Sequence, residues 1–226
     1  MLNMIEMVVF DMAGTTVNEQ NVVYKTLHKS INKHGVLVEL DKVLEIGAGK
    51  EKFQAIKDIL DYADMEQFIN AEVIFEDFKV QLDNAYKHLN VLPIQGVEEV
   101  MMELISKDII VVLNTGYNSK VANSLLEKLH WIKGIHYNLL VTADDVVNGR
   151  PNPDMIELAM KKFKIKDPSK VLKAGDSAID IEEGKNAYCG VTVGVLSGAQ
   201  TKEQIESMNP TYILDSLANL LSLDIF

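Results

Sequence analysis

The 226-residue sequence is poor in cysteine and in positive charge, and both shortages limit the classes of function that the protein could have. Its single cysteine, Cys189, cannot form an intramolecular disulfide, so we expect a reducing compartment. Only 22 lysine and arginine residues face 33 aspartate and glutamate residues, which gives a formal net charge of -11. Because no basic excess is present to neutralise phosphates, nucleic acid and anionic membrane surfaces are unfavourable as main partners.

Long apolar runs are also missing. No stretch approaches the length needed to cross a bilayer, and residues 1–6 lack the charged and apolar blocks of a secretion signal. We therefore expect a cytoplasmic protein without a membrane partner. Its 47% hydrophobic and 24% charged content is that of an ordinary globular protein, long enough for one core and an accessory module.

From residue 96 onward, helical and strand-like patterns alternate along the chain. Helices are predicted at 97–106, 119–129, 153–163 and 177–187, and strands at 109–113, 138–142, 170–174 and 190–195. A further strand is predicted near the start, ending at Phe10. Such alternation is typical of parallel strands joined by crossover helices. The sequence therefore predicts an α/β fold with a Rossmann-like, doubly wound parallel sheet.

The region between the first strand and residue 91 has only helical patterns, with helices predicted at 40–46, 50–60 and 65–89. A purely helical block between two strands of a sheet indicates an inserted module. We therefore predict a discontinuous core domain of residues 1–15 and 92–226, interrupted by an α-helical domain of residues 16–91.

Polar residues follow the predicted strands where their carboxyl ends would lie. They are Asp11 after the first strand, Thr115 and Gly116 after the second, Arg150 after the third, and Asp176 and Asp180 after the fourth. Ligands of open α/β sheets bind beyond the carboxyl ends of the strands, so these residues would share one rim. Taken singly, each also fits a structural role: Asp11 could cap a turn, Asp180 could be an exposed helix residue, and Arg150 could pair with Asp144 or Asp145 at the surface.

Together these side chains suit phosphoryl transfer. An aspartate such as Asp11 can attack phosphorus and form an acyl-phosphate. Bringing two anions together requires a hard divalent cation, for which Asp11 and Asp176 offer oxygen ligands, with Asp180 behind them. Thr115 and the Gly116 amide could bind phosphoryl oxygens, as could the planar guanidinium of Arg150.

The motifs resemble those of the haloacid dehalogenase superfamily over essentially the whole chain. Most members carry a second Asp two residues after the nucleophile as general acid and base, whereas this chain has Ala13. Residues 10–17, 115–117 and 144–151 are most similar to the phosphonatase group, the phosphonoacetaldehyde hydrolases and their phosphonatase-like relatives. The resemblance implies an α-helical cap, a catalytic nucleophile at Asp11, Mg²⁺ held by Asp11, the Ala13 carbonyl and Asp176, and a phosphoryl group held by Thr115 and Arg150.

Without the second Asp, another group must protonate the leaving atom. Phosphonoacetaldehyde hydrolases use a cap lysine that forms a Schiff base, and Gly47-Ala48-Gly49-Lys50 resembles the loop that bears it. Lys50 is the candidate, although a lysine that opens an amphipathic helix is usually just solvated. The cap departs from those enzymes at Ile46, where they have Met, and at Phe53, where they have His.

These observations favour a Mg²⁺-dependent phosphonatase-like hydrolase that cleaves a small phosphorylated or phosphonate metabolite through an aspartyl-phosphate. One alternative is phosphonoacetaldehyde hydrolysis, with cleavage of the C–P bond through a Schiff base on Lys50. Another is a non-catalytic binding or regulatory protein that keeps the fold. The resemblance also implies a homodimer formed through the cap.

Overall fold

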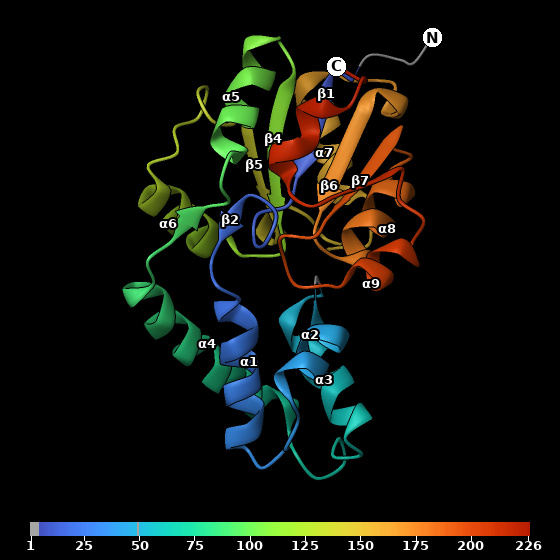
Figure 1. Ribbon diagram of the computed structural model, residues 1–226. Helices are drawn as coiled ribbons and strands as arrows, with labels where there is room; N and C mark the ends of the chain where they lie inside the picture. Colours follow the sequence, from blue (N-terminus) through green and yellow to red (C-terminus); the bar gives the residue numbers. More distant parts are fainter. Residues whose placement is uncertain (1–4, 49) are drawn as a thin grey trace. The chain divides into compact units, whose positions relative to one another are not determined.

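The computed structural model describes residues 5–48 and 50–226 (Figure 1). The chain divides into two compact units, one formed by Met1–Asn18 and Val91–Phe226 and the other by Glu19–Asn90. We call them the sheet unit and the helical unit. Within the described residues, no helix is both long and apolar enough to span a membrane.

The sheet unit contains a six-stranded sheet in which every pair of neighbouring strands is parallel. The strands, in the spatial order β5-β4-β1-β6-β7-β8, are Leu139–Thr142, Ile110–Thr115, Met7–Phe10, Val171–Gly175, Val191–Val195 and Tyr212–Leu214. The chain adds β4 and β5 on one side of β1 and then returns to build β6, β7 and β8 on the other. The strand order therefore reverses at β1, which makes its carboxyl end the switch point where ligands of such sheets bind.

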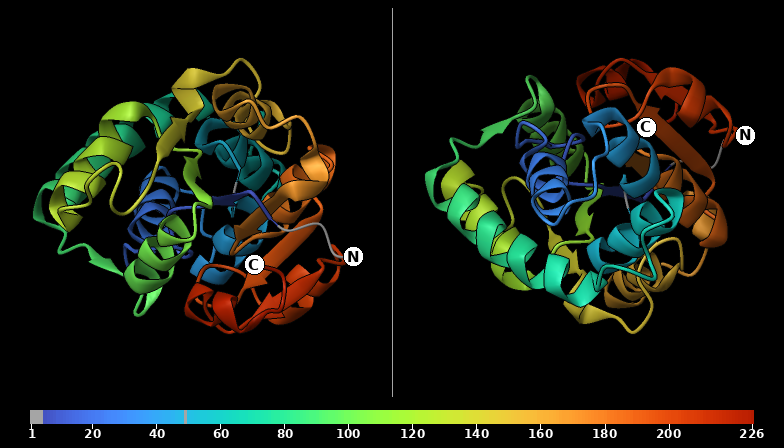
Figure 2. Two further views of the ribbon diagram at one scale, coloured as in Figure 1. Left: turned by 90° about the horizontal axis from the view of Figure 1, so that it is seen from above. Right: turned by 90° about the horizontal axis from the view of Figure 1, so that it is seen from below.

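Helices flank the sheet (Figure 2). The α-helices are α5 (Val97–Ser106), α6 (Ser119–Leu129), α7 (Asp154–Phe163), α8 (Ala178–Asn186) and α9 (Lys202–Glu206), and the 3₁₀ helices are η1 (Ala143–Asp145), η2 (Pro168–Lys170) and η3 (Leu217–Ser222). Met7 and Val9 of β1 pack in one core cluster with Met155 and Ile156 of α7. All four residues of β1 are buried, as expected for a central strand covered on both faces.

The predicted α/β fold with a doubly wound parallel sheet is confirmed. The predicted helices at 97–106 and 119–129 have the observed bounds. A short antiparallel ribbon was missed: β2 (Val17–Asn18) pairs with β3 (Leu92–Pro93) where the chain leaves the sheet unit and returns to it. Two residues per strand are too few to produce a periodic pattern in the sequence.

The helical unit consists of helices, as its sequence pattern indicates. Its elements are α1 (Val22–Lys33), α2 (Leu40–Gly47), α3 (Lys52–Tyr62) and α4 (Ala71–His88). The α4 helix is shorter than predicted, because residues 65–69 form turns and the Asn70 side chain then caps the helix by accepting a bond from the Glu72 amide at 2.8 Å. Glu51 caps α3 by accepting bonds from the Phe53 and Gln54 amides, both at 2.9 Å.

Candidate active site

Asp11 lies directly beyond β1, at the switch point of the sheet. Phe10 is in register with Leu113 of β4 and Ala174 of β6, and the Asp11 amide donates to the Ala174 carbonyl at 3.0 Å. The residue is only 5% exposed although it directly follows the end of a strand. Asp11 is therefore a buried carboxylate with β4 on one side and β6 on the other.

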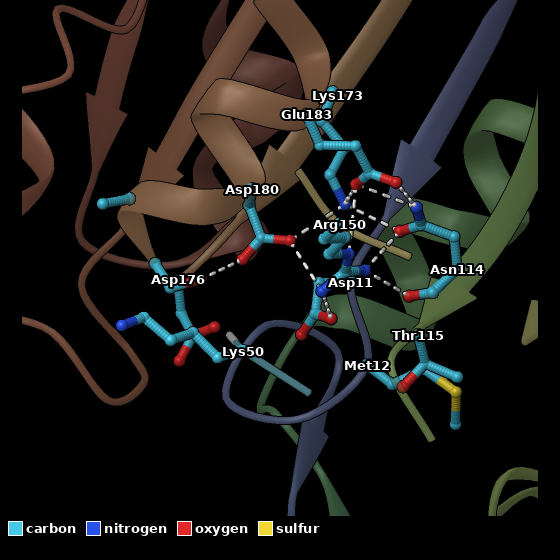
Figure 3. A network of polar contacts seen from close by, with 12 residues as sticks. Asp11, Met12, Lys50, Asn114, Thr115, Arg150, Lys173, Asp176, Asp180 and Glu183 are labelled. Atoms are coloured by element: carbon cyan, nitrogen blue, oxygen red, sulfur yellow. Dashed lines mark hydrogen bonds and ion pairs between the residues drawn. The ribbon is translucent and has the colours of Figure 1, made fainter. Parts of the chain in front are cut away.

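Three aspartates gather at this point. Carboxylate oxygens of Asp11, Asp176 and Asp180 all lie within 4.8 Å of one another, and all three residues are buried (Figure 3). Asp176 follows β6, and Asp180 lies in the first turn of α8. The alternative of an exposed helix residue is wrong for Asp180, which is 0% exposed.

Two glycines leave room for the Asp176 carboxylate. Gly14 has a φ of +76°, and a Cβ there would lie 2.5 Å from Oδ2 of Asp176. A Cβ at Gly198, in the loop after β7, would lie 1.9 Å from the same oxygen. Oδ2 also accepts a bond from the Ala199 amide at 2.6 Å. The two loops thus close around Asp176, and neither glycine can be replaced without moving this carboxylate.

Arg150, the only arginine in the sequence, is inserted into the acidic cluster. Its Nη1 atom lies 2.6 Å from Oδ1 of Asp11 and 2.9 Å from Oδ1 of Asp180. The guanidinium is buried, so the alternative of a surface pair with Asp144 or Asp145 is wrong. Those two carboxylates instead accept bonds from the amides of Ser119 and Thr142.

Behind Arg150 lies a second layer of buried polar side chains, namely Asn114, Lys173 and Glu183 (Figure 3). The Lys173 ammonium lies 3.0 Å from Asp180 and 3.1 Å from Glu183. Sequence reasoning gave these three residues no role. One signal was present: Lys173 interrupts an otherwise apolar strand, and a charged residue in a central parallel strand needs buried partners.

Burial and charge shift the pKa values of the three aspartates in different directions. Desolvation raises the pKa of Asp11 despite the opposing charge of Arg150. Desolvation and the negative charges of Asp11 and Asp180 hold the pKa of Asp176 well above its usual range. Burial also acts to raise the pKa of Asp180, but the charges of Arg150 and Lys173 outweigh it and the pKa is lowered.

The site contains more carboxyl groups than cationic side chains. If Asp11, Asp176, Asp180 and Glu183 are all ionised, they exceed the charges of Arg150 and Lys173 by two, which is the state that a bound cation would favour. Buried charge is costly unless it is paired. An oxygen-lined cluster with that excess fits a hard divalent cation such as Mg²⁺.

The remaining predicted residues of the sheet unit lie in the neighbouring loops. Thr115 ends β4 and is buried, and its Oγ1 accepts a bond from the Tyr117 amide at 3.2 Å, so its own proton is not used in that contact. Gly116 follows it, with open space where a Cβ would be. Ala13 lies in the turn after Asp11, where a bridge joins it to Val17.

Lys50 belongs to the helical unit, just before α3. Its ammonium lies 2.5 Å from Oδ2 of Asp58 in that helix, and both side chains are partly exposed. Burial acts to raise the pKa of Asp58, but hydrogen bonds from Lys50 and Gln54 outweigh it and the pKa is lowered. Lys50 is thus one half of an ion pair inside its own unit.

A parallel α/β sheet with buried carboxylates at its switch point defines a class of enzymes whose acidic site is built from strand ends. The particular family follows from the sequence, which matches the haloacid dehalogenase-like hydrolases over residues 8–196. The chain belongs to this family and is a hydrolase of the phosphatase and phosphonatase-like type.

Named relatives agree with this assignment. A phosphonoacetaldehyde hydrolase from Latilactobacillus sakei is 31% identical over 206 residues, covering 86% of this chain and 77% of that protein. One from Bacillus cereus is 28% identical over 228 residues, covering 94% and 85%. Among solved structures, a phosphonoacetaldehyde hydrolase-like protein from Oleispira antarctica has the same fold, with a TM-score of 0.82 at 22% identity and coverage of 98% and 91%.

Proposed function

We propose that the protein hydrolyses a small phosphorylated or phosphonate metabolite through a covalent phosphoryl intermediate on Asp11. The observation that carries this proposal is the buried cluster of Asp11, Asp176 and Asp180 at the switch point of the sheet. Four carboxylates against two cations suit a site that also takes a divalent metal ion and an anionic phosphoryl group.

In the first step, a carboxylate oxygen of Asp11 bonds to phosphorus, and the bond from phosphorus to the leaving group breaks with its electron pair. Oδ1 of Asp11 accepts the bond from Arg150, so we assign the attack to Oδ2. In the second step, water attacks phosphorus and releases phosphate, and the Asp11 carboxylate is regenerated. Thr115 and the Gly116 amide are the proposed donors to the phosphoryl oxygens.

Asp11, Asp176 and the Ala13 carbonyl are the proposed ligands of Mg²⁺, and Asp180, behind them, would hold a metal-bound water. When bound, the ion would offset the negative charge of the carboxylates and of the phosphoryl group. Arg150 supplies a fixed positive charge beside the attacking carboxylate and holds it in place.

Ala13 cannot protonate a leaving oxygen, so the acid must come from elsewhere. We propose Lys50 for this role. Its Nζ atom lies 2.5 Å from Oδ2 of Asp58, and a lysine ammonium can donate a proton to a leaving oxygen. The chain has Ile46 and Phe53 where phosphonoacetaldehyde hydrolases have Met and His, which favours an ester-type phosphate substrate over one that must form a Schiff base.

A phosphate-release screen across sugar phosphates, nucleotides and phosphonates tests the proposal, with and without Mg²⁺. The protein should release phosphate from at least one substrate, lose that activity in EDTA and regain it with Mg²⁺. Asp11→Asn should lower turnover by at least ~10³-fold. Asp144→Asn is the matched control, because Asp144 bonds to the Ser119 amide rather than to the cluster. Full activity in Asp11→Asn would rule out a nucleophilic role.

Phosphonoacetaldehyde hydrolysis is the second candidate, favoured by the similarity to phosphonoacetaldehyde hydrolases at 31% and 28% identity. It requires a neutral Lys50 amine that condenses with the aldehyde. Borohydride added during turnover of phosphonoacetaldehyde would then fix a covalent adduct on Lys50, seen by peptide mass spectrometry, and Lys50→Arg would abolish it. We expect turnover of a phosphate ester without an adduct, and a Lys50 adduct would establish the second candidate instead.

A further inference from the structure

The side chain of Glu183 lies at the centre of the buried layer behind Arg150. It is 0% exposed, on α8. Its two oxygens accept bonds from the Asn114 amide nitrogen at 2.8 and 3.0 Å. Oε2 also lies 3.1 Å from Nε of Arg150 and 3.1 Å from the Lys173 ammonium. A single carboxylate thus touches three donors from three separate segments of the chain.

Asn114 holds the neighbouring edge of the guanidinium. Nη2 of Arg150 donates to the Asn114 backbone carbonyl at 2.8 Å and to its side-chain oxygen at 2.7 Å. The same side-chain oxygen accepts a bond from Lys173 at 2.7 Å. The amide orientation is chemically forced, because a flipped amide would turn its N–H groups toward two cations.

The guanidinium group is planar and rigid, so the ion pair at Nε and the two hydrogen bonds at Nη2 together constrain where Nη1 points. Glu183 is at Nε and Asn114 is at Nη2, which leaves Nη1 directed at Asp11 and Asp180. The attacking carboxylate is therefore oriented by an arginine that is itself oriented from behind. A lysine in place of Arg150 could not be held in this way, since it has neither Nε–H nor a second terminal nitrogen.

We propose that Glu183 is a positioning residue, which sets the orientation of Arg150 and, through Arg150, that of Asp11. The competing explanation is that Glu183 serves only to balance the charge of Lys173. The expected effect of Glu183 on catalysis rests on the function proposed above, whereas its effect on the orientation of Arg150 does not.

The orientation can be measured directly, because Arg150 is the only arginine. Arginine labelled with ¹⁵N in the side chain gives guanidinium signals from this one residue. In the wild-type protein we expect an Nε–H signal that exchanges slowly with water and separate signals for the two Nη groups. Glu183→Gln should shift the Nε signal and accelerate its exchange at least ~10-fold, since it removes the negative charge that lies 3.1 Å from Nε. Glu182→Gln, on the same turn of α8, is the matched control and should leave the spectrum unchanged.

The double variant Lys173→Met/Glu183→Gln removes one positive and one negative charge together, so the net charge of the buried layer does not change. It can therefore be measured even if Glu183→Gln alone does not fold. A positioning role predicts that the Nε signal stays altered in the double variant. Recovery of the wild-type spectrum there would mean that Glu183 only balances Lys173, and an unaltered spectrum in folded Glu183→Gln would also overturn the proposal.

A kinetic cycle adds the catalytic readout. Glu183→Gln should lower kcat by about 100-fold with little change in KM, the size expected for a small misplacement of reacting groups. In an Arg150→Lys background, which lacks Nε–H, Glu183→Gln should lower kcat by less than about 3-fold if the two residues act as one unit. Equal losses in both backgrounds would overturn the proposal. If the wild-type protein released no phosphate from any substrate, the proposed function would fail, while the arginine spectra would still decide the role of Glu183.

Discussion

Glu19 allows a quantitative test of how burial controls stability in this protein. It is the first residue of the helical unit and is only 2% exposed. Its Oε2 accepts a bond from the Val23 amide, in the first turn of α1, at 3.3 Å. Burial raises the pKa of this carboxyl from 4.5 to about 7, against the opposing effects of the Val23 and Val22 amides and of Lys52 and Lys25.

The sign of the effect follows from that direction. A carboxyl whose pKa is higher in the folded state stabilises the fold below pH 4.5, and this contribution is lost as the pH rises through about 7. The pKa rises from 4.5 to about 7, and each pKa unit corresponds to about 1.36 kcal/mol, so the free energy of unfolding should fall by about 3 kcal/mol in total. About 2.5 kcal/mol of it should develop between pH 5 and pH 8.

Glu19→Gln should remove this dependence, because the amide keeps a bond acceptor for Val23 and carries no charge. We expect the free energy of unfolding in urea, measured at pH 5, 6, 7 and 8, to favour the variant increasingly at higher pH, by about 3 kcal/mol at pH 8. Glu39→Gln, at an exposed glutamate of the same unit, should match the wild-type protein throughout. A stability difference for Glu19→Gln that stays constant with pH would refute the reasoning.

Two further predictions concern the sheet unit. Gly198→Ala places a Cβ 1.9 Å from Oδ2 of Asp176 and should raise the Mg²⁺ concentration for half-maximal activity at least ~10-fold. Gly149→Ala is the control, because a Cβ at Gly149 would lie in open space and should leave that concentration unchanged. Equal Mg²⁺ titrations for the two variants would contradict the proposed role of Asp176. Thr115→Val keeps the shape of the buried side chain but removes its hydroxyl, so kcat/KM for phosphate release should fall by about 100-fold with the fold unchanged by circular dichroism. An unaltered kcat/KM would remove Thr115 from the proposed phosphoryl site.

Local pattern predicted the elements of the sheet unit well. The β4 strand was predicted at 109–113 and lies at Ile110–Thr115, and α7 was predicted at 153–163 and lies at Asp154–Phe163. These elements have strong periodicity, which depends only on residues close in sequence. The α4 helix was predicted too long because residues 65–69 have helical spacing, and the cap at Asn70 is what begins the helix.

The candidate site could be predicted only where a strand ends. Asp11, Thr115 and Asp176 were chosen as candidates because parallel topology brings the carboxyl ends of strands to one edge. Lys173 and Glu183 lie within a strand and a helix, where sequence patterns favour a structural role. Their place in the buried cluster depends on contacts with Arg150 and Asn114, which are distant in sequence.

The sequence by itself determined the order of helices and strands, the parallel sheet and the strand-end carboxylates, because these follow from periodicity and from polar residues that interrupt apolar runs. Only the tertiary structure decided which charges share a buried space. The excess of carboxylates around Arg150, the two glycines beside Asp176 and the orientation of the guanidinium by Glu183 and Asn114 all depend on atoms that are remote in the chain and close in space. The strength of such contacts is set by distance and burial, which no local pattern records.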